Sequence, residues 1–270
     1  MFDISSYMDE DRKRGRDRFA QVLKRAHGLV RAEHASEVLD LTRAQATQLL
    51  SRWSRQGWLR RIGPGLYIPV PVDAIRGDAI IEDPWAIVPE LFGPAYIGGW
   101  SAAEHWDLTE QIFRDILVMS ARERRPRTVE VEGITFALRP VREDQIFAAR
   151  TVWRREHRVL VSDVHRTIVD MLSSPALGGG IQHVDDCLAA YLNHEDSSAL
   201  QLIETADRLG NGAVFKRLGF LAERRGNAEL AEMCAARLTQ GLAQLDPSQR
   251  SASRVPQWRL RVPDAWKSSA

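Results

Sequence analysis

Residues 41–69 (LTRAQATQLLSRWSRQGWLRRIGPGLYIP) constrain the fold more than any other part of this 270-residue chain. They contain five arginines and no aspartate or glutamate. In the first half, Ala46, Leu49, Leu50 and Trp53 recur at helical spacing and form one apolar stripe. In the second half, two short β-prone segments flank a Gly-Pro-Gly turn. A helix followed by a basic hairpin is the pattern of a winged helix-turn-helix, which predicts DNA binding.

Two further helices are expected before this stretch. Residues 16–27 place their apolar side chains on one helical face, and Gly28 is suited to end that helix. A shorter helix is expected over residues 31–39, and Thr42 is a good N-cap for the third helix. Residues 1–70 are therefore predicted to form a winged-helix DNA-binding domain, in which residues 1–15 are flexible.

The side of the third helix opposite the apolar stripe carries glutamine, serine and arginine. These side chains read base edges or hold phosphates. Contacts at or near the bases are assigned to Arg43, Gln45, Gln48 and Arg52. Arg55 is assigned to phosphate, and Arg60 and Arg61 are placed on the wing, within reach of the backbone or the minor groove. The full predicted DNA-binding set is Thr42, Arg43, Gln45, Gln48, Ser51, Arg52, Arg55, Arg60 and Arg61.

A solvated face used for protein contacts is the competing interpretation of this helix. Such a face normally mixes acidic with basic residues, and this one has no acid. The distribution of charge along the chain agrees with a nucleic-acid-binding segment at the N-terminus. Residues 1–69 contain 13 Lys and Arg against 8 Asp and Glu, whereas the remainder contains 24 against 28. A basic first third on a mildly acidic body favours DNA binding by the first third.

The rest of the chain predicts a second domain of mixed sheet and helices. Residues 71–83 are expected to be a linker, because prolines frame them. Residues 84–162 contain several β-branched or alternating segments, which predict a sheet of five to seven strands. Residues 163–243 show five helical patterns, and residues 258–262 (WRLRV) form a closing strand that could return to the sheet. The expected class is α+β, with an N-terminal winged helix followed by a mixed-sheet domain over 84–270 with a C-terminal helical bundle.

Composition argues against several other classes of protein. The two cysteines, Cys187 and Cys234, lie in helical apolar patterns and have no zinc or disulfide spacing. No segment is apolar enough to cross a bilayer, and the N-terminus lacks the apolar run of a signal peptide. The expectation is a cytoplasmic protein that needs no cofactor or metal.

The densest polar cluster, residues 162–166 (SDVHR), raises the question of catalysis. Its Ser, His and Asp are adjacent in sequence, whereas triad members normally come from separate elements. Asp163 is better interpreted as a helix N-cap, and Arg166 and Asp170 as an i,i+4 pair on the exposed side of that helix. His183 and Cys187 make at most half a metal site. No enzyme activity is expected.

The second domain could also be a nuclease or carry an aromatic binding groove. A nuclease needs strand-borne acids followed by lysine, and none of the four lysines stands in such a place. Five aromatic residues could line a groove, although such density favours packing between sheet and helices. They are Trp85, Tyr96, Trp100, Trp106 and Trp153.

Five segments, in this order along the chain, resemble one known family. They are GWLRRIGPGLYIP, AYIGGWSAAEHWDLTEQ, VLVSDVHRTIVDML, VFKRLGFLAE and WRLRV, and the resemblance runs from about residue 16 to 262. The chain is similar to the AbiEi-type antitoxins of bacterial abortive-infection systems, which belong to the type IV toxin–antitoxin class.

This resemblance implies a winged-helix domain that binds inverted repeats in its own promoter and represses transcription. It also implies a C-terminal domain that counteracts a nucleotidyltransferase-like toxin, and antitoxins of this class need not form a stable complex with the toxin. The competing hypothesis is a stand-alone winged-helix regulator whose C-terminal domain senses a ligand. A toxin gene next to this one would favour the antitoxin.

Overall fold

The computed structural model describes residues 4–71, 81–122 and 126–267, with side chains from Lys13 onwards. Helices and a mixed sheet confirm the predicted α+β class. The chain divides into two compact units. Unit 1 comprises Met1–Leu91 with the two short segments Glu130–Ile134 and Trp153–Arg158, and unit 2 comprises the rest. Most of the predicted linker lies outside the described residues, so the domain boundary after residue 70 stays a prediction.

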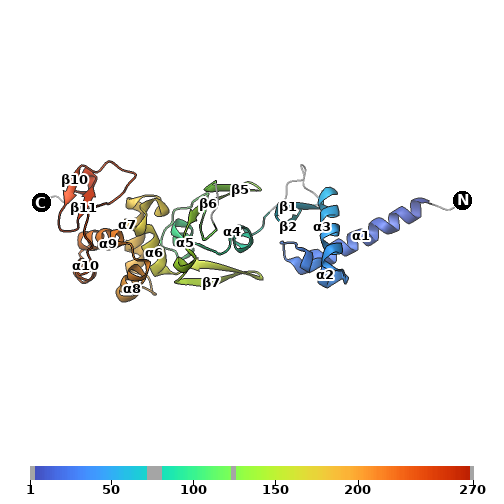
Figure 1. The fold of residues 1–270 in the computed structure, drawn as a ribbon, viewed down its shortest axis with the longest axis horizontal. Coiled ribbons are helices and arrows are strands. Elements are labelled where there is room, and N and C mark those ends of the chain that lie inside the picture. Colours follow the sequence, from blue (N-terminus) through green and yellow to red (C-terminus); the bar gives the residue numbers. More distant parts are fainter. Residues whose placement is uncertain (1–3, 72–80, 123–125, 268–270) are drawn as a thin grey trace. The chain divides into compact units, whose positions relative to one another are not determined.

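Unit 1 begins with three helices and a hairpin (Figure 1). The first helix was expected over residues 16–27, but it already begins at Ile4, within the residues predicted to be flexible. A short 3-10 turn and helix follow near the end of the unit. The elements are α1 (Ile4–Ala26), α2 (Ala32–Leu39), α3 (Arg43–Arg55), β1 (Leu59–Gly63), β2 (Leu66–Pro69), η1 (Pro84–Ile87) and α4 (Val88–Phe92).

The hairpin has the form of a wing. Strands β1 and β2 pair antiparallel around Pro64-Gly65, and Gly65 has a φ of +69°, which glycine adopts without steric cost. Val30, between α1 and α2, forms an isolated antiparallel bridge with Tyr67 of β2 through two backbone hydrogen bonds of 2.8 and 3.0 Å. Three helices with a small sheet and a basic hairpin form the predicted winged helix-turn-helix.

An aromatic cluster holds α3 in this module. Phe19 of α1 packs against Trp53 of α3 and against Trp58, with ring centroids 5.1 and 5.3 Å apart. Buried Val22, Ala46 and Leu50 complete the contact between α1 and α3. Three large rings bury much apolar area, so the orientation of α3 relative to the wing is fixed by packing.

Unit 2 contains most of a six-stranded mixed sheet with the order β5-β6-β4-β3-β8-β7. Strand β4 pairs parallel with β6 and antiparallel with β3, and β3 pairs parallel with β8. Within the region predicted to be rich in strands, residues 145–152 contain the end of a 3-10 turn and the start of β7. The elements are β3 (Ala95–Ile97), β4 (Ile116–Ser120), β5 (Thr128–Val131), β6 (Ile134–Pro140), η2 (Glu143–Gln145), β7 (Ala149–Arg154) and β8 (His157–Ser162).

The helices of unit 2 are arranged around α6. This helix contacts α5, α7, α8 and α9, and residues 164–172 are all buried (Figure 1). The five helical patterns predicted after residue 163 are all present. The elements are α5 (Gly99–His105), α6 (Val164–Ser173), η3 (Pro175–Gly178), α7 (Ile181–Leu192), α8 (Ala199–Leu209), α9 (Gly212–Arg224) and α10 (Ala228–Ala235).

The closing strand does not return to the main sheet. It joins a separate three-stranded sheet made of β9 (Ala243–Gln244), β10 (Ser253–Val255) and β11 (Leu260–Val262), followed by η4 (Asp264–Trp266). The reason is a tertiary contact. Buried Trp258 packs on α9 where Gly219 has no side chain, and its indole donates to Glu223 at 2.6 Å, which ties this segment to α9. Within the described residues, no helix has the length and apolar character to cross a membrane.

Gly219→Ala is expected to destabilise unit 2 by about 1–3 kcal/mol, because the added Cβ would lie 2.0 Å from the Trp258 ring. Gly15→Ala is the matched control. Its Cβ would meet Trp58 at an ordinary 3.7 Å, and alanine favours a helix interior. Calorimetric unfolding of both variants measures the effect, and an unchanged unfolding temperature for Gly219→Ala would contradict this account of the packing.

Candidate nucleic-acid interface

Helix α3 starts from a well-formed N-terminal cap. The Thr42 hydroxyl accepts from the Gln45 backbone N–H at 3.3 Å, and the Gln45 side-chain oxygen accepts from the Thr42 backbone N–H at 3.0 Å. This is a capping box, and the sequence Thr-x-x-Gln encodes it. The helix then buries Ala46, Leu50 and Trp53 against the rest of unit 1. Cap and buried stripe together fix which residues face outward.

The predicted DNA-binding residues lie on the surface of this module. Eight of the nine side chains are exposed, and Ser51 is half-buried. Their surroundings separate them into two groups. Those held by neighbours in unit 1 are Thr42, Arg43, Gln45, Arg60 and Arg61.

Each held residue has an identifiable partner. Arg43 forms an ion pair with Glu33 of α2 at 3.2 Å, and Gln45 belongs to the cap. On the wing, the Arg61 Nε donates to the Gly63 carbonyl at 3.1 Å, and Arg60 lies 3.9 Å from Glu132. These contacts involve exposed side chains and restrain them only weakly.

The other group has no polar side-chain partner. Within the described part of the chain, the side chains of Gln48, Ser51, Arg52 and Arg55 make no hydrogen bond or ion pair. Gln48 and Arg55 lie almost opposite the buried stripe at 100° per residue, and Arg52 and Arg55 occupy the last turn. Amide and guanidinium groups that point into solvent without a partner are available for a polyanion.

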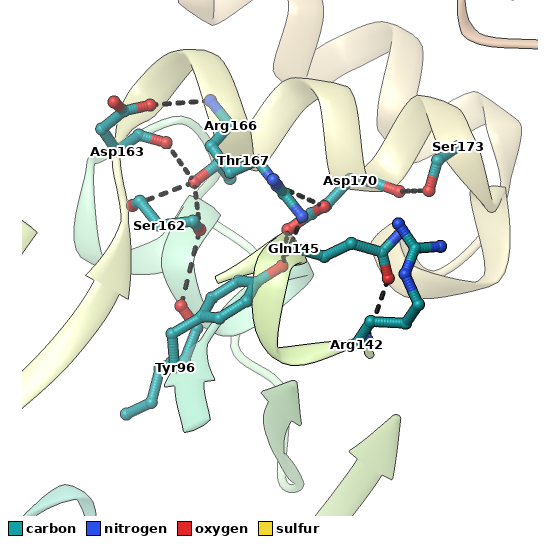
Figure 2. A network of polar contacts seen from close by, with 10 residues as sticks. Tyr96, Arg142, Gln145, Ser162, Asp163, Arg166, Thr167, Asp170 and Ser173 are labelled. Atoms are coloured by element: carbon teal, nitrogen blue, oxygen red, sulfur yellow. Dashed lines mark hydrogen bonds and ion pairs between the residues drawn. The ribbon is translucent and has the colours of Figure 1, made fainter. Parts of the chain in front are cut away.

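A second polar cluster lies inside unit 2, at the position where the helix periodicity predicted an exposed ion pair. Arg166 and Asp170 are instead buried, with side-chain exposures of 1% and 2%. The Arg166 Nε donates to Asp170 at 2.7 Å and its Nη2 donates to the Tyr96 hydroxyl at 2.9 Å. That hydroxyl donates to Asp170 at 2.8 Å, which closes a ring of three side chains (Figure 2).

The helix periodicity of residues 164–173 did not reveal this burial, because the partner Tyr96 comes from a strand 70 residues earlier. Burial, followed by the charge of Asp170, raises the pKa of Tyr96, so its hydroxyl remains a neutral donor. The Arg166 guanidinium carbon also lies 4.2 Å from the centroid of Phe147. The ring joins strand β3 to helix α6 and is a structural element.

The neighbouring candidates for catalysis are also engaged in structure. Asp163 caps α6 by accepting from the Arg166 backbone N–H at 2.7 Å, as predicted. The ring nitrogen Nδ1 of His165 lies 2.8 Å from the Tyr191 hydroxyl, and burial lowers the pKa of His165. Neutral histidine in this contact ties α6 to α7.

His183 and Cys187 were suggested by the sequence as half of a metal site. In the structure, His183 instead forms hydrogen bonds to two neighbouring segments. His183 lies 2.6 Å from the Gly178 carbonyl and 2.7 Å from the Thr109 hydroxyl, which uses both ring nitrogens. Burial raises the pKa of the Cys187 thiol to about 12, which disfavours the thiolate that a metal needs. Among the described residues, no group of three or more His, Cys, Asp or Glu is placed to hold a metal.

The aromatic set does not line one groove. Tyr96 and Trp100 are buried, and Trp85 and Trp106 are half-buried. The indole of Trp106 donates to the Ser162 carbonyl at 2.7 Å. Trp153 was expected in the core but is 62% exposed on β7. Its alternating position in that strand could have indicated a solvent-facing side chain.

Asp170→Ala is expected to cost about 3–5 kcal/mol of unfolding free energy, because it leaves the Arg166 charge buried and uncompensated. The double variant Arg166→Met/Asp170→Leu is expected to recover most of that loss. Asp144→Ala, at the exposed Arg142–Asp144 pair, is the control and should change stability little. Urea unfolding measures all three, and a stable Asp170→Ala protein would refute a buried ion pair.

Comparison with known proteins supports both the fold and the identity of the first module. The crystal structure of the RV2827C protein from Mycobacterium tuberculosis superposes with a TM-score of 0.60 at 17% sequence identity. The similarity covers 92% of this chain and 91% of that chain, and at this identity it shows a shared fold. No curated protein sequence matches the chain.

A family model places the N-terminal module more specifically. Residues 17–70 match the model described as "Transcriptional regulator, AbiEi antitoxin". The match covers the C-terminal part of α1, then α2, α3 and the wing, and it includes every residue of the candidate interface. Residues 17–70 therefore match the AbiEi antitoxin family of transcriptional regulators, which confirms the resemblance for this part of the chain.

Proposed function

We propose that this protein binds its own promoter DNA through α3 and the wing, represses transcription there, and counteracts a nucleotidyltransferase-like toxin through its second unit. One observation carries the DNA-binding part. An exposed helix face presents Gln48, Arg52 and Arg55 without polar partners among the described residues, on a segment that contains no acidic residue. A solvated helix face normally mixes acidic with basic residues, and this one carries no acid.

The arrangement of the module suits double-stranded DNA. A recognition helix enters the major groove with its N-terminal residues at the base edges. Arg52 was assigned to the bases from its residue type, but it lies with Arg55 in the last turn of α3, where we expect both to reach phosphates as the helix leaves the groove. The wing places Arg60 and Arg61 on its exposed side, since Leu59 and the residues of β2 face the core.

The family match supports the regulatory part of the proposal. The name of that family couples transcriptional regulation to antitoxin activity, and the match lies entirely within the module that carries the basic face. Inverted repeats in the promoter are the expected target. Unit 2 is the larger part of the chain, and we assign to it the action against the toxin.

The double variant Arg52→Ala/Arg55→Ala is expected to weaken binding to the promoter and to unrelated duplexes alike. The logarithm of affinity should fall with the logarithm of salt, and the double variant should reduce that slope by about 2 because two phosphate contacts are lost. Arg250→Ala, an exposed arginine in unit 2, is the control. Fluorescence anisotropy between 50 and 200 mM salt, roughly the range over which such contacts weaken, measures the slopes. Identical slopes for the double variant and the wild type would rule out this face.

The antitoxin part predicts that DNA binding and rescue separate. When the toxin encoded by the adjacent gene is expressed from an independent promoter, wild-type protein should restore growth. The full-length double variant Arg52→Ala/Arg55→Ala should restore it equally, while failing to repress a reporter under the native promoter. Loss of rescue together with repression would contradict this division of labour. A wild-type protein that represses but does not rescue would favour the ligand-sensing regulator.

A further inference from the structure

We infer that α3 selects A·T base pairs, with Gln48 reading adenine and Ala44 contacting the methyl group of thymine. This inference rests on the proposed function, because it names the DNA sequence class that the same face would prefer. It also changes the assignment made from the sequence, in which Gln45 and Gln48 were equivalent candidates. The structure separates the two glutamines by their hydrogen bonds.

Gln45 is occupied by the helix cap. Its side-chain oxygen accepts from the Thr42 backbone N–H and from the Thr42 hydroxyl, both at 3.0 Å. A backbone N–H can only donate, so the oxygen of the amide must face the cap. Reading adenine needs the amide oxygen and the amide nitrogen together, at N6 and N7 of the base. Gln45 would have to break the cap of its own helix to do this.

Gln48 has both amide atoms available. Its side chain is exposed and makes no hydrogen bond within the described chain. At 100° per residue it lies about 140–160° around the helix from the buried Ala46, Leu50 and Trp53. It also lies in the first half of α3, the half that meets base edges in helix-turn-helix proteins. An unoccupied glutamine at this position can bind adenine with two hydrogen bonds.

Ala44 precedes Gln48 by one helical turn on the same face. Its methyl group is exposed to solvent, where it contributes no apolar burial, and it could make an apolar contact with the methyl group of thymine. The two Cα atoms are about 6 Å apart along the helix axis, and successive base pairs are about 3.4 Å apart. The two side chains therefore fall within reach of neighbouring base pairs.

Guanine has no equivalent reader at this end of the helix. Arg43 stands at the first position of α3, but its charge is paired with Glu33. This exposed pair is weak, but the position of Arg43 on the helix also separates it from the outward face. At 100° per residue Arg43 lies about 20° around the helix from the buried Leu50 and about 140° from Gln48. Arg52 and Arg55 are a turn or more further along. The residues left in the first half of the outward face favour adenine and thymine.

The test is selection from randomised duplexes with the full-length protein, followed by anisotropy on the selected site. The wild type is expected to enrich an A·T pair, and Gln48→Ala should lower discrimination at that pair by about 5- to 150-fold. Gln56→Ala removes the same side chain from an exposed position at the end of α3 and is the matched control. Replacing the adenine by 7-deazaadenine should weaken wild-type binding and leave the affinity of Gln48→Ala unchanged.

Ala44 and Gln45 are tested on the same site. Exchanging the contacted thymine for uracil removes its methyl group and should weaken wild-type binding, while Ala44→Gly should be insensitive to that exchange. Gln45→Ala should weaken binding to all duplexes equally, through the cap. The inference is overturned if Gln48→Ala keeps the adenine preference or if Gln45→Ala loses it. A wild type that binds no duplex in a salt-sensitive manner would instead remove the proposed function itself.

Discussion

The buried guanidinium of Arg166 is the group on which the second unit depends. A charge held at 1% exposure is tolerated only with a partner charge beside it. Asp170 supplies the charge from the same helix, and Tyr96 bridges both from strand β3 (Figure 2). Because α6 contacts four other helices, fixing it against the sheet also fixes their positions. Removing one member of the ring is more damaging than replacing all of it, since a single loss leaves a charge buried in a medium of low dielectric.

The segments outside the winged helix that resemble family motifs are explained by the same kind of contact. In VFKRLGFLAE, Arg217 is buried and donates only to backbone carbonyls, including Leu172 at 2.7 Å and Gln244 at 2.8 Å. Those carbonyls belong to the end of α6 and to the small terminal sheet. Gly219 makes room for Trp258 of the segment that ends in the closing strand. These segments therefore connect helices and sheets.

The winged-helix module uses its polar groups differently. Its residues could be assigned from the sequence by type and spacing, and their exposure agrees with those assignments. Whether each side chain already has a hydrogen-bond partner could not be assigned, because a glutamine that caps a helix and one that does not look alike in a sequence. Gln45 and Gln48 are three residues apart on one helix, yet only the first is bound to Thr42. Arg43 and Arg52 differ in the same way, through Glu33 on a neighbouring helix.

Sequence alone determined the helices, the wing, most strands and the family of the first module, because these depend on local spacing, caps and turn residues. The Thr42 cap, the positive φ of Gly65 and the Asp163 cap are of this kind. Tertiary structure decided which polar side chains are buried and which distant segments they contact. Arg166 and Asp170 have an exposed-looking i,i+4 spacing, and only the approach of Tyr96 from another strand buries them. The separate closing sheet was likewise decided by Trp258 packing on α9, since strand propensity does not specify a partner.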